Sequence, residues 1–284
     1  MKTHTKGLLI TMIGVLFVVP DALFVRLIDA APLTIAFWRN MLAGVVIGVV
    51  ILATTGARSV VRIYARGLLV WLYSAFLGVS GILFVLAVAN TSVANVVAII
   101  AALPVFAALL SRVFLGERIS ARMALTIMCV SAGLGIIAYG SGEGANTSLW
   151  GDALALGVAF TFAASLTIAR KFSDISMVPA IPLASIGGAL TLLPFTDIWA
   201  FAPQSWPLIA LHGGVFIAVS TIFLSTGPRY LPSAEVALLI LLETVLAPLL
   251  VWAVLGEALT IWAFIGGGVV VGALVVSNLM LLRR

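Results

Sequence analysis

The chain has 284 residues, of which 63% are hydrophobic and only 9% are Asp, Glu, Lys or Arg. A typical soluble domain is roughly 25% charged, so this composition excludes a soluble fold and indicates a protein embedded in the lipid bilayer. The net charge of +5 does not indicate a nucleic-acid partner, because the basic residues are scattered singly among apolar runs. The single cysteine, Cys129, permits no intrachain disulfide and no thiolate metal cluster.

Ten apolar stretches are long enough to cross a bilayer as helices, which requires about 20 residues each. They cover residues 7–27, 32–54, 67–88, 92–115, 122–140, 149–169, 178–196, 207–226, 233–255 and 260–282. They are longer and more uniformly apolar than the alternating strands of a membrane β-barrel. The first run follows Lys2 and Lys6 as a signal peptide would, but no small-residue cleavage site follows, so we expect a retained helix. The sequence predicts an all-α polytopic membrane protein with ten transmembrane helices.

The basic residues predict the orientation of these spans. When ten helices are threaded through the bilayer, every Lys and Arg except Arg26 and Arg39 falls on the side of the N-terminus. Positively charged residues concentrate on the cytoplasmic side of membrane proteins. We therefore expect a multi-pass protein of the cell (inner or plasma) membrane with both termini in the cytoplasm.

An internal repeat becomes visible when the chain is aligned with itself so that Ala94–Ser120 matches Ala234–Thr260. The first copy reads VFAALLSRVFLGERIS and the second reads VLAPLLVWAVLGEALT, with Leu-Gly-Glu at equivalent helix ends. The repeat predicts two halves, residues 1–140 and 141–284, with five helices each. Because five is an odd number, the second half must cross the membrane in the opposite sense. Inverted repeats are typical of secondary transporters, whose substrate sites lie at the repeat interface near the midplane.

The sequence reads FWRNMLAG at Phe37–Gly44 and LLETVLAPLL with LGEALT at Leu241–Thr260, and it carries the paired Gly-Glu. In these features the chain resembles the drug/metabolite transporter superfamily, in particular its EamA family. The resemblance covers nearly the whole chain, and it is closest to exporters of aromatic and other amino acids. One departure is Thr244, since such proteins often have proline after the glutamate of the ninth helix. Pro248, one turn later, would supply the kink instead.

Two charged residues at matching depth are the first candidate site. Asp21 lies about 9 Å from the outer end of the first span, and Arg39 lies about 10 Å into the second. A short connection makes these spans antiparallel neighbours, so the two side chains are predicted to pair. Ionisable groups inside a membrane cost about 2.5–3.5 kcal/mol on insertion scales and therefore need a partner or a function. The pair is either structural or a device that attracts a substrate carboxylate or works as a gate.

Glu243 is the second candidate, because it lies near the centre of the ninth span, away from any loop. It is expected either to face a cavity and handle protons, or to make a structural hydrogen bond or pair, for which Arg39 is one candidate. His212, near the outer end of the eighth span, is interpreted as interfacial. Trp38, Tyr73 and Asn95 are further candidates for substrate contact.

Prolines and glycines predict where helices bend and end. Pro20, Pro104 and Pro248 fall inside spans, where proline removes a backbone hydrogen bond and kinks the helix. Gly116 and Gly256 suit left-handed helix C-termini, and Ser120 and Thr260 suit the N-caps that follow. This explains the Gly-Glu motifs structurally, so Glu117 and Glu257 are not site candidates. The small-residue pairs Gly44/Gly48 and Gly268/Gly272 indicate close packing of helices within the chain.

The leading functional hypothesis is a secondary transporter that exports small organic metabolites by alternating access around a central cavity. Its preferred substrates, by family resemblance, are amino acids including aromatic ones. The sequence contains no nucleotide-binding phosphate loop and no metalloprotease or Cys/His metal motif, so no enzyme activity, metal or cofactor is expected. The expected partners are a small-molecule substrate and the lipid bilayer, and the expected state is a monomer, with a dimer as the alternative. The alternative functions are an uptake carrier for a nucleoside- or cofactor-like metabolite and a non-catalytic lipid-handling or accessory membrane subunit.

Overall fold

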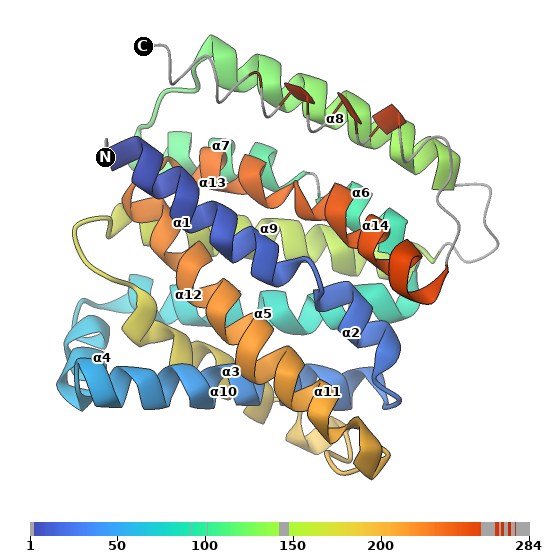
Figure 1. The fold of residues 1–284 in the computed structure, drawn as a ribbon. Coiled ribbons are helices and arrows are strands. Elements are labelled where there is room, and N and C mark those ends of the chain that lie inside the picture. The colour runs from blue at the N-terminus through green and yellow to red at the C-terminus, as the bar shows by residue number, and fades with distance from the viewer. Residues whose placement is uncertain are drawn as a thin grey trace.

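The computed structural model describes residues 3–91, 93–100, 102–141 and 148–256, together with 265–266, 268–269, 272–273 and 276. Within these ranges the regular elements are helices (Figure 1), and an isolated β-bridge joins Ala30 to Phe201. The elements are α1 (Thr3–Val18), α2 (Asp21–Leu27), α3 (Pro32–Thr54), α4 (Ala57–Tyr64), α5 (Leu68–Asn90), α6 (Val93–Ile100), α7 (Leu103–Leu115), α8 (Ala121–Ser141), α9 (Leu149–Lys171), η1 (Val178–Ala180), α10 (Ile181–Leu190), η2 (Leu193–Phe195), η3 (Pro203–Ser205), α11 (Trp206–Leu211), η4 (His212–Ile217), α12 (Ala218–Thr226), η5 (Gly227–Arg229), α13 (Ser233–Ile240) and α14 (Glu243–Leu255).

Seven helical segments among the described residues are long and apolar enough to cross a membrane. They cover His4–Leu27, Pro32–Thr54, Leu68–Asn90, Leu149–Lys171, Val178–Phe195, Pro203–Arg229 and Ser233–Leu255, and two shorter apolar helices cover Leu103–Leu115 and Ala121–Gly133. The prediction of a helical, multi-pass membrane protein is therefore confirmed. The predicted tenth span, residues 260–282, lies largely outside the described residues, so the count of ten stays a prediction.

The repeat appears in the helix boundaries themselves. In the alignment of the two halves, α13 begins and ends opposite the first and last residues of α6, and α14 matches α7 in the same way. Both α7 and α14 end at a glycine in the left-handed conformation, with φ of 68° at Gly116 and 72° at Gly256. Glycine adopts positive φ without the steric cost that a Cβ would add. The predicted caps at these two positions are therefore confirmed, and Ser120 also accepts a bond from the Met123 N–H, as predicted for an N-cap.

Close helix contacts hold the bundle together around one large and two smaller clusters of buried apolar residues. Helix α5 packs along α9, and α3 packs along α10 (Figure 1). A Cβ added to Gly44 of α3 would lie 2.7 Å from Cγ1 of Ile186 in α10, so the absence of a side chain allows this approach. The predicted packing role of Gly44 inside the chain is therefore confirmed.

Among the described residues, three breaks separate consecutive α-helices inside apolar segments. One lies between α1 and α2 at Val19 and Pro20, and the other two lie between α6 and α7 and between α13 and α14. Pro248 lies inside α14, and the break in this segment falls earlier, at Leu241 and Leu242, so the bend predicted at Pro248 stays a prediction.

The break before α14 has a local cause. The N–H of Leu242 donates to the Leu239 carbonyl at 3.0 Å, and the N–H of Thr244 donates to the Leu241 carbonyl at 3.1 Å. The Thr244 hydroxyl also donates to the Leu241 carbonyl at 2.6 Å. These bonds reach back three residues instead of four, so the chain tightens there and the carbonyl of Leu241 is still satisfied.

Candidate functional site

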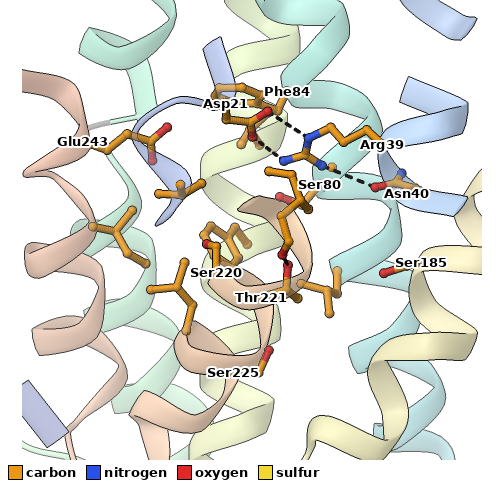
Figure 2. A pocket seen from close by; sticks show the side chains of 18 of the residues that line it. Asp21, Arg39, Asn40, Ser80, Phe84, Ser185, Ser220, Thr221, Ser225 and Glu243 are labelled. Atoms are coloured by element: carbon orange, nitrogen blue, oxygen red, sulfur yellow. Dashed lines mark hydrogen bonds and ion pairs between the residues drawn. The ribbon is translucent and has the colours of Figure 1, made fainter. Parts of the chain in front are cut away.

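A cavity of about 90 Å³ lies between helices contributed by the two repeats. Its polar wall consists of side chains from α2, α3, α5, α10, α12 and α14 (Figure 2). These polar residues are Asp21, Arg39, Asn40, Ser80, Ser185, Ser220, Thr221, Ser225 and Glu243, and the apolar ones include Phe84, Ile100, Phe162, Leu224 and Ile240. A few convergent polar groups in an apolar concavity are the usual composition of a small-molecule site.

Arg39 and Asp21 form a buried ion pair at one end of this cavity. The Arg39 Nε donates to Asp21 Oδ1 at 3.0 Å, and its Nη2 donates to Asp21 Oδ2. The Arg39 Nη1 donates to Asn40 Oδ1 at 3.3 Å, and the guanidinium lies 5.8 Å from the ring centre of Phe84. The side chains of Arg39 and Asp21 are 9% and 1% exposed. The contact predicted from matching depth is therefore present in the structure.

His212 completes this charged group. Its Nε2 lies 2.7 Å from Asp21 Oδ1, its side chain is 1% exposed, and its ring stacks on Phe24 at 5.1 Å between centres. Since an ionised carboxylate only accepts hydrogen bonds, Nε2 carries the hydrogen and donates. The interpretation of His212 as interfacial was wrong, because the π-helix η4 that it begins packs against α3 and faces inward. Its depth in the eighth span resembles the depth of Arg39 in the second span. This match in depth could have indicated that His212 lies near the ion pair.

Glu243 is the first residue of α14, directly after the break, and it is buried. Its carboxyl group points into the cavity from the wall opposite Arg39 (Figure 2). Among the described residues no hydrogen bond or ion pair involves this carboxyl group, and Arg39 binds Asp21 instead of Glu243. The cavity thus holds two acidic groups and one guanidinium. An acid without a partner in a membrane needs a proton or a ligand.

Two other predicted site residues, Trp38 and Tyr73, lie away from the cavity wall. Trp38 donates from Nε1 to the Ile198 carbonyl at 2.7 Å and packs edge-on against Trp206. Tyr73 is buried and donates to the hydroxyl of Ser225 at 2.8 Å, so it touches a lining residue without lining the cavity. Asn95 belongs to α6, and its side chain lies outside the described part of the structure.

The prolines do not line the cavity either. Pro20 immediately precedes α2, Pro104 lies in the first turn of α7, and Pro248 lies within α14. Pro20 and Pro104 therefore lie beside breaks, whereas Pro248 does not. No set of three or more His, Cys, Asp and Glu side chains in the described ranges is arranged to hold a metal ion.

The hydroxyl groups of the cavity were not among the residues predicted from the sequence. Thr221 and Ser225 on α12 both line the cavity and are spaced four residues apart, so they share a helix face. Repeated small hydroxyl residues on one face of an apolar span were the available signal. Gly81 lies on the same wall, where an added Cβ would come 2.7 Å from both Nη1 of Arg39 and Oδ1 of Asn40.

Comparisons with known proteins agree with this architecture. The model of the EamA-like transporter family matches residues 5–139 and again residues 149–279. A solved crystal structure of a protein is 18% identical, with a TM-score of 0.77 over 97% of this chain and 99% of that chain, and this likeness concerns the fold alone. No curated protein matches the sequence. Since the family match covers most of the chain as two repeats, the chain belongs to the EamA-like transporter family of the drug/metabolite transporter superfamily.

Proposed function

We propose that this protein is a secondary transporter that exports small organic metabolites, with amino acids, including aromatic ones, as the preferred substrates. The observation that carries the proposal is the cavity between the two repeats, which offers Arg39 and the unpaired Glu243 within apolar walls. Family membership supports transport, and the chemistry of the wall supports the substrate class.

The hydrogen-bond inventory of Arg39 supports binding of a carboxylate. A guanidinium has five N–H donors, and three of them are used for Asp21 and Asn40. The remaining donors are available to the carboxylate of an incoming solute, which guanidinium groups bind with matching geometry. The carboxyl group of Glu243, on the opposite wall, suits a substrate ammonium group. Phe84, Phe162 and Ile240 provide apolar surface for a hydrophobic side chain.

The size of the cavity supports alternating access. At about 90 Å³ it is well below the roughly 300–1,000 Å³ of typical ligand pockets, so this conformation must widen to admit an amino acid. We propose that the halves 1–140 and 141–284 are inverted five-helix repeats of a ten-helix bundle, and that they rock against each other. The breaks before α7 and α14 are the proposed hinges, at equivalent places in the two halves. We further propose that the protein lies in the inner or plasma membrane of the cell with both termini in the cytoplasm. The proposed working unit is a monomer.

The test is counterflow in proteoliposomes. Purified protein is reconstituted into vesicles preloaded with one unlabelled amino acid, and uptake of the same labelled amino acid is followed for a panel of aromatic, aliphatic and charged members. We expect counterflow with large apolar and aromatic amino acids, and loss of about tenfold or more in Arg39→Lys, which keeps the charge but not the fork of donors. Glu117→Gln, at a partly exposed ion pair away from the cavity, is the matched control and should retain activity.

The alternatives give different results in the same assay. Counterflow of nucleosides without counterflow of amino acids would replace the proposed substrate class. Inertness with every solute, by protein that elutes as a single species, would favour a lipid-handling or accessory subunit. Export itself is tested by preloading cells with a labelled substrate, where expression should accelerate efflux rather than accumulation.

A further inference from the structure

A second concavity lies on the outside of the bundle, between α5, α7 and α9. Its volume is about 300 Å³, larger than the central cavity. Apart from Thr167 and Lys171, the residues that line it are apolar: Leu69, Leu72, Phe76, Leu110, Phe114, Leu115, Phe160, Ala164 and Ile168. We refer to this concavity as the lateral groove.

The shape of the lateral groove follows from side-chain size. Ala164 is small and lies at its floor, while Phe160 packs edge-on against Phe76, with 6.2 Å between the ring centres, and so closes one end. The hydroxyl of Thr167 donates to the Ala163 carbonyl at 2.8 Å, so its hydrogen is turned back into α9. The groove is therefore an apolar channel in a face that α9 presents to the membrane. Within a bilayer, lipid hydrocarbon rather than water fills such a groove.

The length of the lateral groove matches one leaflet of a bilayer. Phe160 is the middle residue of α9, and Lys171 is its last residue. Eleven residues at 1.5 Å each give a length of about 16 Å, and half of a hydrocarbon core of roughly 30 Å is about 15 Å. The walls agree with this placement, since α5 contributes its first residues and α7 contributes its last.

Lys171 supplies a charge at the open end. It is exposed, and no ion pair involves it among the described residues. The adjacent Arg170 is engaged differently, because its Nε donates to Glu117 at 2.8 Å and its Nη1 to the Pro228 carbonyl at 3.2 Å. A long lysine side chain at a helix end extends toward the headgroup region. Its ammonium group is complementary to the phosphate of an anionic headgroup.

We propose that the lateral groove binds one acyl chain of an anionic phospholipid, with the headgroup phosphate at Lys171. In the orientation proposed above, this lipid belongs to the cytoplasmic leaflet. The site is separate from the central cavity, since the two share no lining residue.

The test uses full-length protein in nanodiscs that contain phosphatidylglycerol or phosphatidylcholine with a photoreactive group at the middle of one acyl chain. After illumination, mass spectrometry of peptides should place the strongest labelling on α9 and on the last two turns of α7. Ala164→Phe fills the floor and should reduce that labelling about fivefold or more. Ala153→Phe is the matched control, because Ala153 is exposed on the outer half of the same helix and outside the groove.

The headgroup has its own test. In wild-type protein, phosphatidylglycerol should label the groove about fivefold more than phosphatidylcholine, the effect expected of a single lysine near a membrane surface. Lys171→Gln should remove this preference, whereas Arg66→Gln, a basic residue at the same end but outside the groove, should retain it. Labelling spread evenly over exposed helices, no preference between the lipids, or a protein–protein crosslink at Ala164 would overturn the proposal. If Ala164→Phe fails to fold, the labelling pattern of the wild-type protein and the lipid preference of Lys171→Gln still test the proposal.

Discussion

The ion pair between Asp21 and Arg39 gives the sharpest prediction about stability. Asp21→Asn keeps the shape of the side chain but replaces an acceptor oxygen facing Arg39 Nη2 with an NH₂ donor. Arg39 then keeps its charge with a side chain only 9% exposed, and one charge-assisted bond is lost. Removing one partner of a buried pair costs about 3–5 kcal/mol. We expect Asp21→Asn to lower the free energy of unfolding by that amount.

The double-mutant cycle separates the pair from the individual residues. Arg39→Met alone leaves Asp21 with the His212 contact at 2.7 Å, so its cost should be smaller, about 2–3 kcal/mol. In the double variant Asp21→Asn/Arg39→Met neither charge remains. Its loss of unfolding free energy should therefore be about 2–3 kcal/mol smaller than the sum of the two single losses. The measurement is reversible unfolding in mixed micelles with increasing dodecyl sulfate, followed by helical circular dichroism.

The partly exposed pair between Glu117 and Arg170 is the matched control, since its side chains are 28% and 26% exposed. Solvent screens such a pair, so Glu117→Gln should cost less than about 1 kcal/mol. A buried, mutually stabilising pair is refuted if Asp21→Asn costs no more than Glu117→Gln, or if the two losses in the cycle simply add. Either result would mean that water or lipid headgroups reach the pair in a way that its burial excludes.

Three further results are expected. If Glu243 handles protons, an imposed pH gradient should drive transport and Glu243→Gln should abolish that response; indifference of the wild-type protein to the gradient would count against this role. Gly81→Ala places a Cβ 2.7 Å from Nη1 of Arg39 and should raise KM in counterflow about tenfold, whereas Gly187→Ala, with no neighbour within 4 Å, should not. Gly116→Ala forces alanine to a φ of 68° and should cost about 1–2 kcal/mol by the same unfolding assay, and an unchanged midpoint would contradict the cap.

The sequence predicted those features that depend on hydrophobic length, helix-end chemistry and repetition. When the two halves are aligned through Leu-Gly-Glu, α6 and α7 begin and end at the positions equivalent to the ends of α13 and α14. Equivalent sequences therefore begin and end helices at equivalent positions. The contact between Asp21 and Arg39 was also predictable, since depth in two antiparallel neighbours follows from residue counting. Such counting uses only the rise per residue and needs no knowledge of the packing.

What the sequence did not predict depends on contacts between distant segments. His212 pairs with a residue 191 positions away, and only the packing of η4 against α3 brings them together. The break before α14 likewise coincides with backbone bonds that span three residues and with the Thr244 hydroxyl bond, and no proline lies at this break. Trp38 precedes Arg39 but faces the segment around Ile198, because successive residues on a helix point about 100° apart.

The two halves share a scaffold but differ in chemistry, and this difference bears on mechanism. Glu243 begins α14, and the residue that begins α7 at the equivalent place is Leu103, which is fully buried. The ion pair belongs entirely to the first half and the unpaired acid to the second. The proposed rocking of one half against the other would change the separation between Glu243 and Arg39. It would also act on the contact between His212 of the second half and Asp21 of the first. A solute that binds both groups stabilises only the arrangements in which they lie within its reach, so its binding energy would act directly on the rocking motion proposed for transport.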